Sequence, residues 1–258
     1  QVRNYLDFSD AYFDEDSYLA SVNVAHNLAS LYFRAFDEKF VEEIRSYAIN
    51  YFRKILSNLG WEPKKSDKHT DALLRTFAIA VLGKMNDETV TDEAIKKYKK
   101  FLKSPRSLSP DLIETICSIA AWNGNSKTFA ELKKLYTNAK TMEEKLRFLG
   151  AMCGFQDKKL LVKTLDFSQT SAVRSQNMQL PIMKIAGNPY GDKVLWPWLK
   201  KNWKKINKKV GHGNPLFNRI VASIAGVADD SMEKEIKLFF KNNPTPGTER
   251  TQSQTLER

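Results

Sequence analysis

The sequence predicts an all-α fold of about a dozen short helices that alternate in direction. Apolar residues recur every three or four positions along almost the whole chain, as on the buried stripe of a helix. Alternating segments typical of strands are nearly missing, and turn signals divide the stripes into helices of about 12–20 residues. Many short antiparallel helices with short loops are typical of a HEAT- or armadillo-like α-solenoid with a concave face. No strict sequence repeat is visible, so a compact multi-helix bundle is the alternative.

Each apolar stripe identifies one expected helix. In chain order, the stripes cover residues 19–31, 40–59, 95–102, 112–120, 129–136, 146–152, 160–165, 194–206 and 236–240. The chain has 258 residues, of which 42% are hydrophobic, and this is enough for a substantial core. We therefore expect one helical domain over residues 1–258.

Capping and turn residues set the expected helix ends. Asp87 and Thr91 are both candidate N-caps for the helix that reaches residue 102. Thr141 is followed three positions later by Glu144, which is the spacing of a capping box. Further signals are Ser109-Pro110 and Ser126 as helix starts, Gly124 as a helix end, and turns at 187–191 and 211–215.

Pro197 falls inside the stripe at 194–206. Proline cannot donate a backbone hydrogen bond and disrupts a helix interior. We therefore expect either a helix that begins near Trp196 or a helix that is kinked at Pro197.

The net charge of +11 is unevenly distributed. Residues 1–60 carry nine acidic and six basic side chains, whereas residues 157–210 carry three acidic and twelve basic ones. Three lysine pairs, at 200–201, 204–205 and 208–209, form a basic block. Such a block attracts nucleic acid, an acidic membrane surface or peptide carboxylates, although a solvated helix face is the simpler interpretation.

The sequence carries no signs of a secreted or membrane protein. Gln1-Val2-Arg3 leads into a polar segment, and no apolar run approaches the length of a membrane span. Cys117 and Cys153 lie in apolar helical patterns, which favours buried thiols over disulfides. We therefore expect a cytoplasmic location and no contact with a membrane.

The sequence lacks the motifs of an enzyme active site. His26, His69 and His212 are far apart, so no H-E-x-x-H zinc motif exists, and no C-x-x-C, phosphate-binding loop or nucleophile elbow is present. The carboxylate pairs 42–43 and 143–144 fall in expected first helical turns, where acidic residues complement the helix dipole. We therefore expect no catalytic residue, metal ligand or cofactor site in this chain.

Several short strings, in order, resemble one family. In the second half these are Arg174-Ser175-Gln176, Asn188-Pro189-Tyr190-Gly191, Trp196-Pro197-Trp198-Leu199-Lys200-Lys201-Asn202-Trp203, and a tail with Arg250, Gln254 and Glu257. Looser matches in the first half are Tyr12-Phe13 with Asp16 and Tyr18, Arg75 with Gly83, and Glu144-Lys145-Leu146-Arg147. This order resembles the C-terminal domain of the gluzincin (M1) family of zinc aminopeptidases. Pro197, Trp198 and Asp16 depart from the family pattern.

The resemblance implies a non-catalytic domain of a longer enzyme. In the family, zinc and the catalytic residues belong to an upstream domain, and the C-terminal domain is a bowl of helices that covers the active-site chamber. The partners implied are that catalytic domain and peptide substrates. The resemblance also implies that the chain is truncated at both ends.

Two sets of site residues follow from the resemblance and the charge pattern. Because the second half is basic, we expect one or more of Arg147, Arg174, Lys184 and Arg219 to bind the C-terminal carboxylate of a peptide. For the motif residues we expect local structural roles. Those residues are Asn188, Pro189, Gly191, Trp196, Asn202, Trp203, Arg250 and Glu257.

Two other functions fit the same features. Lysines interleaved with Trp196, Trp198 and Trp203 could bind nucleic acid through phosphate contacts and base stacking. Those tryptophans share a stripe with Leu199 and Ile206, which favours burial and argues against this alternative. A stand-alone helical scaffold for protein partners is the other alternative.

Overall fold

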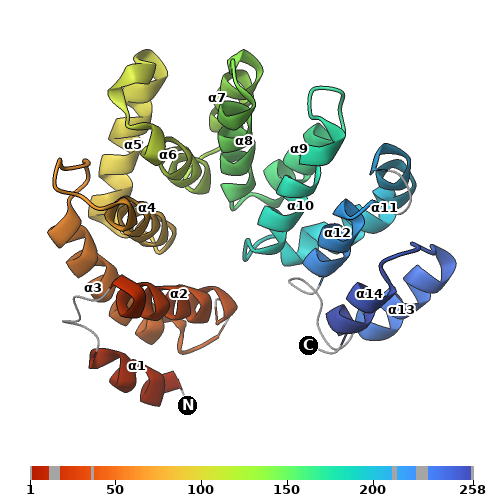
Figure 1. Ribbon diagram of the computed structural model, residues 1–258, viewed down its shortest axis with the longest axis horizontal. Coiled ribbons are helices and arrows are strands. Elements are labelled where there is room, and N and C mark those ends of the chain that lie inside the picture. Colours follow the sequence, from red (N-terminus) through yellow and green to blue (C-terminus); the bar gives the residue numbers. More distant parts are fainter. Residues whose placement is uncertain (1, 12–17, 36–37, 211–213, 225–231, 257–258) are drawn as a thin grey trace. The chain divides into compact units, whose positions relative to one another are not determined.

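The fold is all-α, as the sequence predicts. A computed structural model describes residues 2–11, 18–35, 38–210, 214–224 and 232–256, which contain fourteen α-helices, short 3-10 turns and no strand (Figure 1). The chain forms two compact units, Gln1–Ala120 and Ala121–Arg258. Tyr12, Phe13, Asp16, the turn residues 211–213 and Glu257 lie outside the described residues.

Unit 1 is built from helices that contact one another in chain order. Helix α2 packs on α3, α3 on α4 and α4 on α5. This succession of neighbouring antiparallel helices buries one stripe of each, including Ile44 and Phe52 of α3 and Leu82 of α4. The helices are α1 (Val2–Asp10), α2 (Tyr18–Arg34), α3 (Val41–Leu59), α4 (His69–Lys84), α5 (Glu88–Lys103) and α6 (Pro110–Trp122), with the 3-10 turn η1 (Pro105–Ser107) before α6.

A buried arginine holds the connection between α3 and α4. Arg75 of α4 is 1% exposed. Its guanidinium donates to the carbonyl oxygens of Leu59 and Gly60 at 3.1 and 2.9 Å, and to Asp67 Oδ2 at 2.5 Å. These bonds satisfy carbonyl groups at the end of α3 that have no partner within the helix. Arg75 therefore fixes the end of α3 and the following loop to α4.

Unit 2 consists of two layers of stacked helices. Helices α8, α10, α12 and α14 contact one another in succession, and we call them the even layer; α7, α9, α11 and α13 form the odd layer (Figure 1). Stacking of successive helix pairs is the local arrangement of an α-solenoid. The helices are α7 (Ser126–Asn138), α8 (Met142–Ala151), α9 (Lys158–Ser168), α10 (Gln179–Ala186), α11 (Asp192–Val210), α12 (Leu216–Ile224), α13 (Glu233–Asn242) and α14 (Glu249–Leu256), with 3-10 turns η2 (Met152–Gly154) and η3 (Ser175–Asn177).

An aromatic cluster joins the last helices of unit 2. The ring of Trp203 on α11 meets Phe217 of α12 and Phe239 and Phe240 of α13 edge to face, with centroids 5.8, 5.4 and 5.7 Å apart. Trp196, one and a half to two turns earlier on α11, meets Phe239 at 5.1 Å. Such edge-to-face pairs are favourable beyond the area that they bury. The cluster therefore fixes α12 and α13 against α11.

Helix α11 runs without interruption through Pro197. The helix begins at Asp192 and ends at Val210, so the expectation of a start near Trp196 is wrong. Pro197 is exposed and lies in the second turn of α11. Since proline has no amide hydrogen, the carbonyl oxygen of Lys193 lacks its usual backbone donor four residues later.

The predicted caps of α5 and α8 are confirmed. Asp87 accepts a hydrogen bond from the amide of Val90 at 2.9 Å, and α5 begins at Glu88, so Thr91 is not the cap. At α8, Thr141 Oγ1 accepts from the amide of Glu144 at 3.1 Å, and Glu144 Oε2 accepts from the amides of Thr141 and Lys140 at 3.1 and 2.9 Å. These are the two halves of a capping box, with one further bond.

This capping box predicts a pH-dependent contribution to stability. The amide of Thr141, and then that of Lys140, favours the ionised carboxylate, so the pKa of Glu144 lies below its ordinary value of 4.5. A lowered folded-state pKa stabilises the fold above the unfolded pKa, and this contribution is lost as the pH falls through the folded pKa. We expect Glu144→Gln to lower the urea midpoint at pH 7 and to have little effect at pH 3. An equal loss at both pH values would contradict this role of the charge.

Candidate functional site

The basic residues expected to bind a carboxylate lie in unit 2, on two different parts of it. Arg147, Lys184 and Arg219 belong to α8, α10 and α12, which are successive helices of the even layer. Arg174 precedes η3 in the connection between α9 and α10. The structure therefore brings three of the four onto one layer and leaves Arg174 apart from them.

Lys184 and Arg219 share the open face of the even layer. Helix α10 is flanked by α8 and α12 in its own layer and is covered by α9 and α11 of the odd layer. The exposed residues of α10, Met183 and Lys184, must therefore lie on the side that faces away from the odd layer. Helix α12 has α10 and α14 beside it and α11 behind it, and Arg219 is exposed. Adjacent packed helices lie about 8–10 Å apart, so the two cations belong to one surface, which we call the basic face.

Arg147 is less exposed than Lys184 and Arg219. Its side chain is 22% exposed, and its Nη2 lies 2.6 Å from Glu143 Oε1, one turn earlier on α8. An ion pair four residues apart on a helix surface is weak and common. Lys184 and Arg219 are exposed, so they are more accessible to an incoming anion than Arg147.

Arg174 lies beside α7. It is exposed, and its positive charge acts on Tyr136, the α7 residue whose hydroxyl donates to the carbonyl oxygen of Ala172 at 2.9 Å. Burial raises the pKa of Tyr136, and the charge of Arg174 partly opposes that increase.

The turn at 187–191 is held by one side chain. Asn188 is 7% exposed, and its Nδ2 donates to the carbonyl oxygens of Cys153 and Phe155 at 2.9 and 3.0 Å. Its Oδ1 accepts from the amide of Tyr190 at 2.9 Å. The amide group of Asn188 therefore connects the loop after η2 with the turn between α10 and α11.

Gly191 is required by the close approach of backbone within this turn. A Cβ atom at Gly191 would lie 1.9 Å from the carbonyl oxygen of Ile185. The amide of Gly191 donates to the carbonyl oxygen of Asn188 at 2.7 Å, and its own carbonyl accepts from Leu195 at 2.9 Å to start α11. Pro189 is half-buried between these two anchors.

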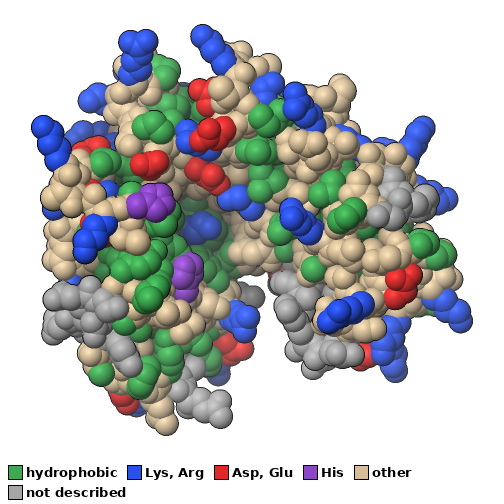
Figure 2. Space-filling view, in the orientation of Figure 1, with side chains coloured by type: hydrophobic (Ala, Val, Ile, Leu, Met, Phe, Trp, Pro, Cys, Tyr) green, Lys and Arg blue, Asp and Glu red, His purple; other side chains and the backbone are tan. Residues whose placement is uncertain are grey.

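The tryptophans of the basic block are buried. Trp196, Trp198 and Trp203 are 2%, 5% and 2% exposed. Base stacking needs an accessible ring face, so these side chains supply no stacking platform for nucleic acid. On the face seen in Figure 2, lysine and arginine side chains are scattered among hydrophobic, acidic and uncharged ones.

Two other motif residues lie on α11 and α14. Asn202 is 8% exposed, and its Nδ2 donates to the carbonyl oxygen of Trp198 at 2.9 Å, one turn earlier on α11. Arg250 is exposed in the first turn of α14.

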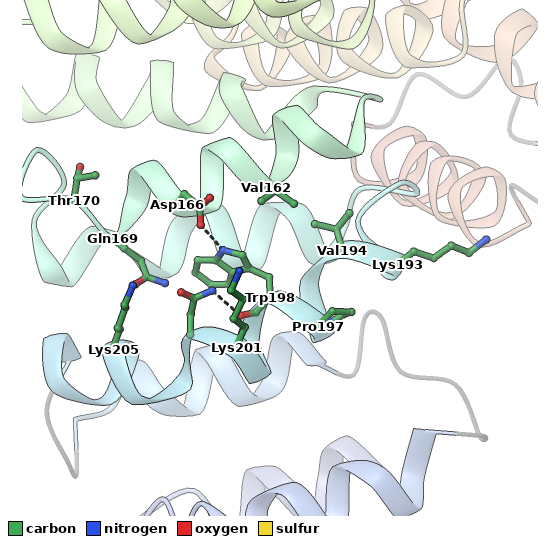
Figure 3. A pocket seen from close by; sticks show the side chains of 11 residues that line it. Val162, Asp166, Gln169, Thr170, Lys193, Val194, Pro197, Trp198, Lys201 and Lys205 are labelled. Atoms are coloured by element: carbon green, nitrogen blue, oxygen red, sulfur yellow. Dashed lines mark hydrogen bonds between the residues drawn. The ribbon is translucent and has the colours of Figure 1, made fainter.

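The sequence did not single out a groove between α9 and α11 (Figure 3). This groove, of about 700 Å³, has lysines along its α11 side, Asp166, Gln169 and Thr170 along its α9 side, and apolar atoms between. We call it the lysine groove. The α11 residues that line it are Lys193, Val194, Pro197, Trp198, Lys201, Asn202 and Lys205. In the sequence, Lys193, Lys201 and Lys205 are spaced in multiples of four residues, which places these lysines along one side of a helix. The sequence does not show which helix packs beside them.

One lysine of the basic block serves the fold. Lys209 Nζ donates to the carbonyl oxygens of Ser168, Thr170 and Val173 at 3.0, 2.9 and 3.0 Å. Partial burial lowers the pKa of Lys209. This ammonium group ties the loop after α9 to the end of α11.

The described residues offer no metal site and no membrane span. No group of three or more His, Cys, Asp or Glu side chains among them could hold a metal ion. No described helix is both long enough and apolar enough to cross a bilayer. Cys117 and Cys153 are 0% and 3% exposed and are free thiols, which confirms the prediction of buried cysteines. Burial raises the pKa of the Cys117 thiol, which makes it unreactive.

Comparison with known proteins identifies one domain family. The model of the ERAP1-like C-terminal domain matches residues 1–258. Among curated proteins, the chain is 28% identical over 249 residues to Aminopeptidase M1-D of Oryza sativa subsp. japonica, covering 95% of this chain and 28% of that protein. It is 26% identical to Aminopeptidase M1 of Arabidopsis thaliana over 86% of this chain and 26% of that protein.

A third relative is Aminopeptidase 2, mitochondrial, of Saccharomyces cerevisiae. It is 25% identical over 261 aligned positions, which cover 98% of this chain and 27% of the yeast protein. The chain thus spans little more than a quarter of the length of the curated relatives that it matches.

Proposed function

Because the chain belongs to the ERAP1-like C-terminal domain family, we propose that it is the non-catalytic C-terminal domain of an M1-type zinc aminopeptidase. In this proposal it covers the active-site chamber of a catalytic domain in the same protein, and its basic face binds the distal end of peptide substrates. The zinc ion of that catalytic domain would polarise the scissile carbonyl and activate water. The residues of this chain take no part in that chemistry.

The observation that carries the proposal is the pairing of the family match with the basic face. An aminopeptidase holds the substrate's amino terminus at its metal, so the C-terminal carboxylate projects away from the catalytic site. Lys184 and Arg219 are exposed cations on neighbouring helices of one layer, and such groups attract a carboxylate. A wall with this charge would favour peptides long enough to reach it, which would couple substrate length to binding.

A binding experiment tests the distal-end role. The probe is a fluorescein-labelled peptide of nine alanine and serine residues, with either a free C-terminal carboxylate or an amide. We expect the chain to prefer the free acid, and the double variant Lys184→Ala/Arg219→Ala to weaken its binding about 3-fold to 10-fold, because two exposed cations are lost. Fluorescence anisotropy at low salt measures the affinities.

The matched control removes two cations from the other layer. Lys204→Ala/Lys208→Ala changes two exposed residues of α11 and keeps the basic face intact. We expect this variant to retain the preference for the free acid. Equal binding of acid and amide by the unmodified chain would exclude distal-end binding and leave the domain as a wall of the chamber.

A further inference from the structure

The lysine groove carries an excess of positive charge. Lys193, Lys201 and Lys205 line it from α11, and all three are exposed. The acidic residue on the opposite side, Asp166, already accepts a hydrogen bond from Trp198 Nε1 at 2.8 Å (Figure 3). With three lysines and one carboxylate in its lining, the groove is cationic and favours an anionic occupant.

The spacing of the lysines matches an extended peptide. With a rise of about 1.5 Å per residue, Lys193 and Lys201 are separated by about 12 Å along α11, and Lys201 and Lys205 by about 6 Å. In an extended chain, side chains at i, i+4 and i+6 point to one side and lie about 13 Å and 7 Å apart. Carboxylates at those three positions would each face one lysine.

The groove also offers polar groups for a peptide backbone. The side chain of Gln169 lines it, and its Nε2 has no hydrogen-bond partner among the described residues. A rotation of that side chain would present an amide donor to the groove. Pro197, also in the lining, has no amide hydrogen to donate to the carbonyl oxygen of Lys193.

We propose that the lysine groove binds an extended acidic segment of a partner protein, with carboxylates at positions i, i+4 and i+6. Nucleic acid is the weaker candidate because Trp198, the one aromatic side chain in the lining, is 5% exposed and cannot stack on a base. The groove lies between two helices of the odd layer, whereas the basic face is the open side of the even layer. This inference is therefore independent of the proposed function.

The test uses an acidic heptapeptide with both ends blocked. The probe is fluorescein-Glu-Ser-Ala-Ser-Glu-Ala-Glu-amide, and its isomer has the second glutamate moved one position earlier, at i+3. Both peptides have the same charge and length, but in the isomer the middle carboxylate points to the other side. Neither has a free C-terminal carboxylate, which is the group that the basic face is proposed to recognise.

Two double variants locate the binding on α11. We expect Lys201→Ala/Lys205→Ala to weaken binding of the probe by about 5-fold to 10-fold, since two cation–carboxylate pairs are lost. Lys204→Ala/Lys208→Ala removes the same charge from positions that do not line the groove, and should weaken binding less than 2-fold by the same reasoning. The unmodified chain should bind the probe more tightly than the isomer.

Four results would overturn the proposal. Equal weakening by the two double variants would show attraction to the whole basic block. Equal affinity for the probe and the isomer would show that the lysine spacing does not select carboxylates at i, i+4 and i+6. Tighter binding of a seven-nucleotide oligothymidylate than of the probe would make the occupant a nucleic acid, and no detectable binding of the probe at low salt would leave the groove unused.

Discussion

Replacing Gly191 with alanine is expected to destabilise unit 2 by about 3 kcal/mol, because overpacking against fixed backbone has costs of this size. The new methyl group would lie 1.9 Å from the carbonyl oxygen of Ile185, which is a backbone atom at the end of α10. Relief requires the turn to open, and this would disturb the hydrogen bonds of Gly191 with Asn188 and Leu195. Thermal unfolding followed by circular dichroism should show a midpoint lower by about 6–12 °C.

The neighbouring glycine provides the control. At Gly187, in the same turn, a Cβ atom would meet its nearest neighbour, the carbonyl oxygen of Lys184, at 3.7 Å, which is ordinary contact. We expect Gly187→Ala to change the midpoint by less than about 2 °C. If Gly191→Ala also unfolded at the unmodified temperature, the close packing of this turn would be disproved.

Replacing Arg75 with methionine is expected to destabilise unit 1 by about 3 kcal/mol, because buried polar partners lose their donor. Methionine fills much of the same volume but leaves the carbonyl oxygens of Leu59 and Gly60 without the guanidinium, and Asp67 without its ion pair. Urea unfolding of the chain should show a lower midpoint with an unchanged slope. The urea midpoint of Arg75→Lys should lie between those of the unmodified chain and Arg75→Met, since a single ammonium group cannot reach all three partners in the same geometry.

A surface arginine in the same unit distinguishes burial from charge. Arg3 forms an ion pair with Glu43 at 2.9 Å, and both side chains are largely exposed. Solvent screens such pairs, so Arg3→Ala should leave the unfolding midpoint unchanged. A comparable loss in both arginine variants would show that net charge, and not the buried network of Arg75, controls stability.

The helices and their caps were predictable because they depend on local chemistry. Thr141 and Glu144 are close in sequence, and the capping box that they form needs no information about distant residues. The uninterrupted α11 shows the limit of such rules. Pro197 is exposed and lies in the second turn of α11. The helix therefore tolerates the loss of one backbone hydrogen bond, whereas a proline in the sequence is usually read as a helix break.

The basic face, the bonds of Arg75 and the lysine groove could not be predicted, because they depend on contacts between residues that are distant in sequence. The i, i+3 and i+4 pattern cannot show that α10 lies between α8 and α12, which is what brings Lys184 and Arg219 onto one face. The sequence does not show that Arg75 is buried, because its partners Leu59, Gly60 and Asp67 belong to the end of α3 and the following loop. Likewise, the lysine groove exists only because α9 lies beside α11.

Asn188 has a mechanical consequence for unit 2. Its side chain makes two hydrogen bonds to the corner that follows α8 and one within its own corner, which joins α10 to α11. A hinge at either corner would have to break these bonds in a site that water does not reach, so the two corners move together as one joint. Under the proposed function, any flexing that closes the domain over a peptide would therefore be distributed among the helix interfaces on either side of this joint. Asn188 thereby keeps α8, α10 and α11 in a fixed relation to one another.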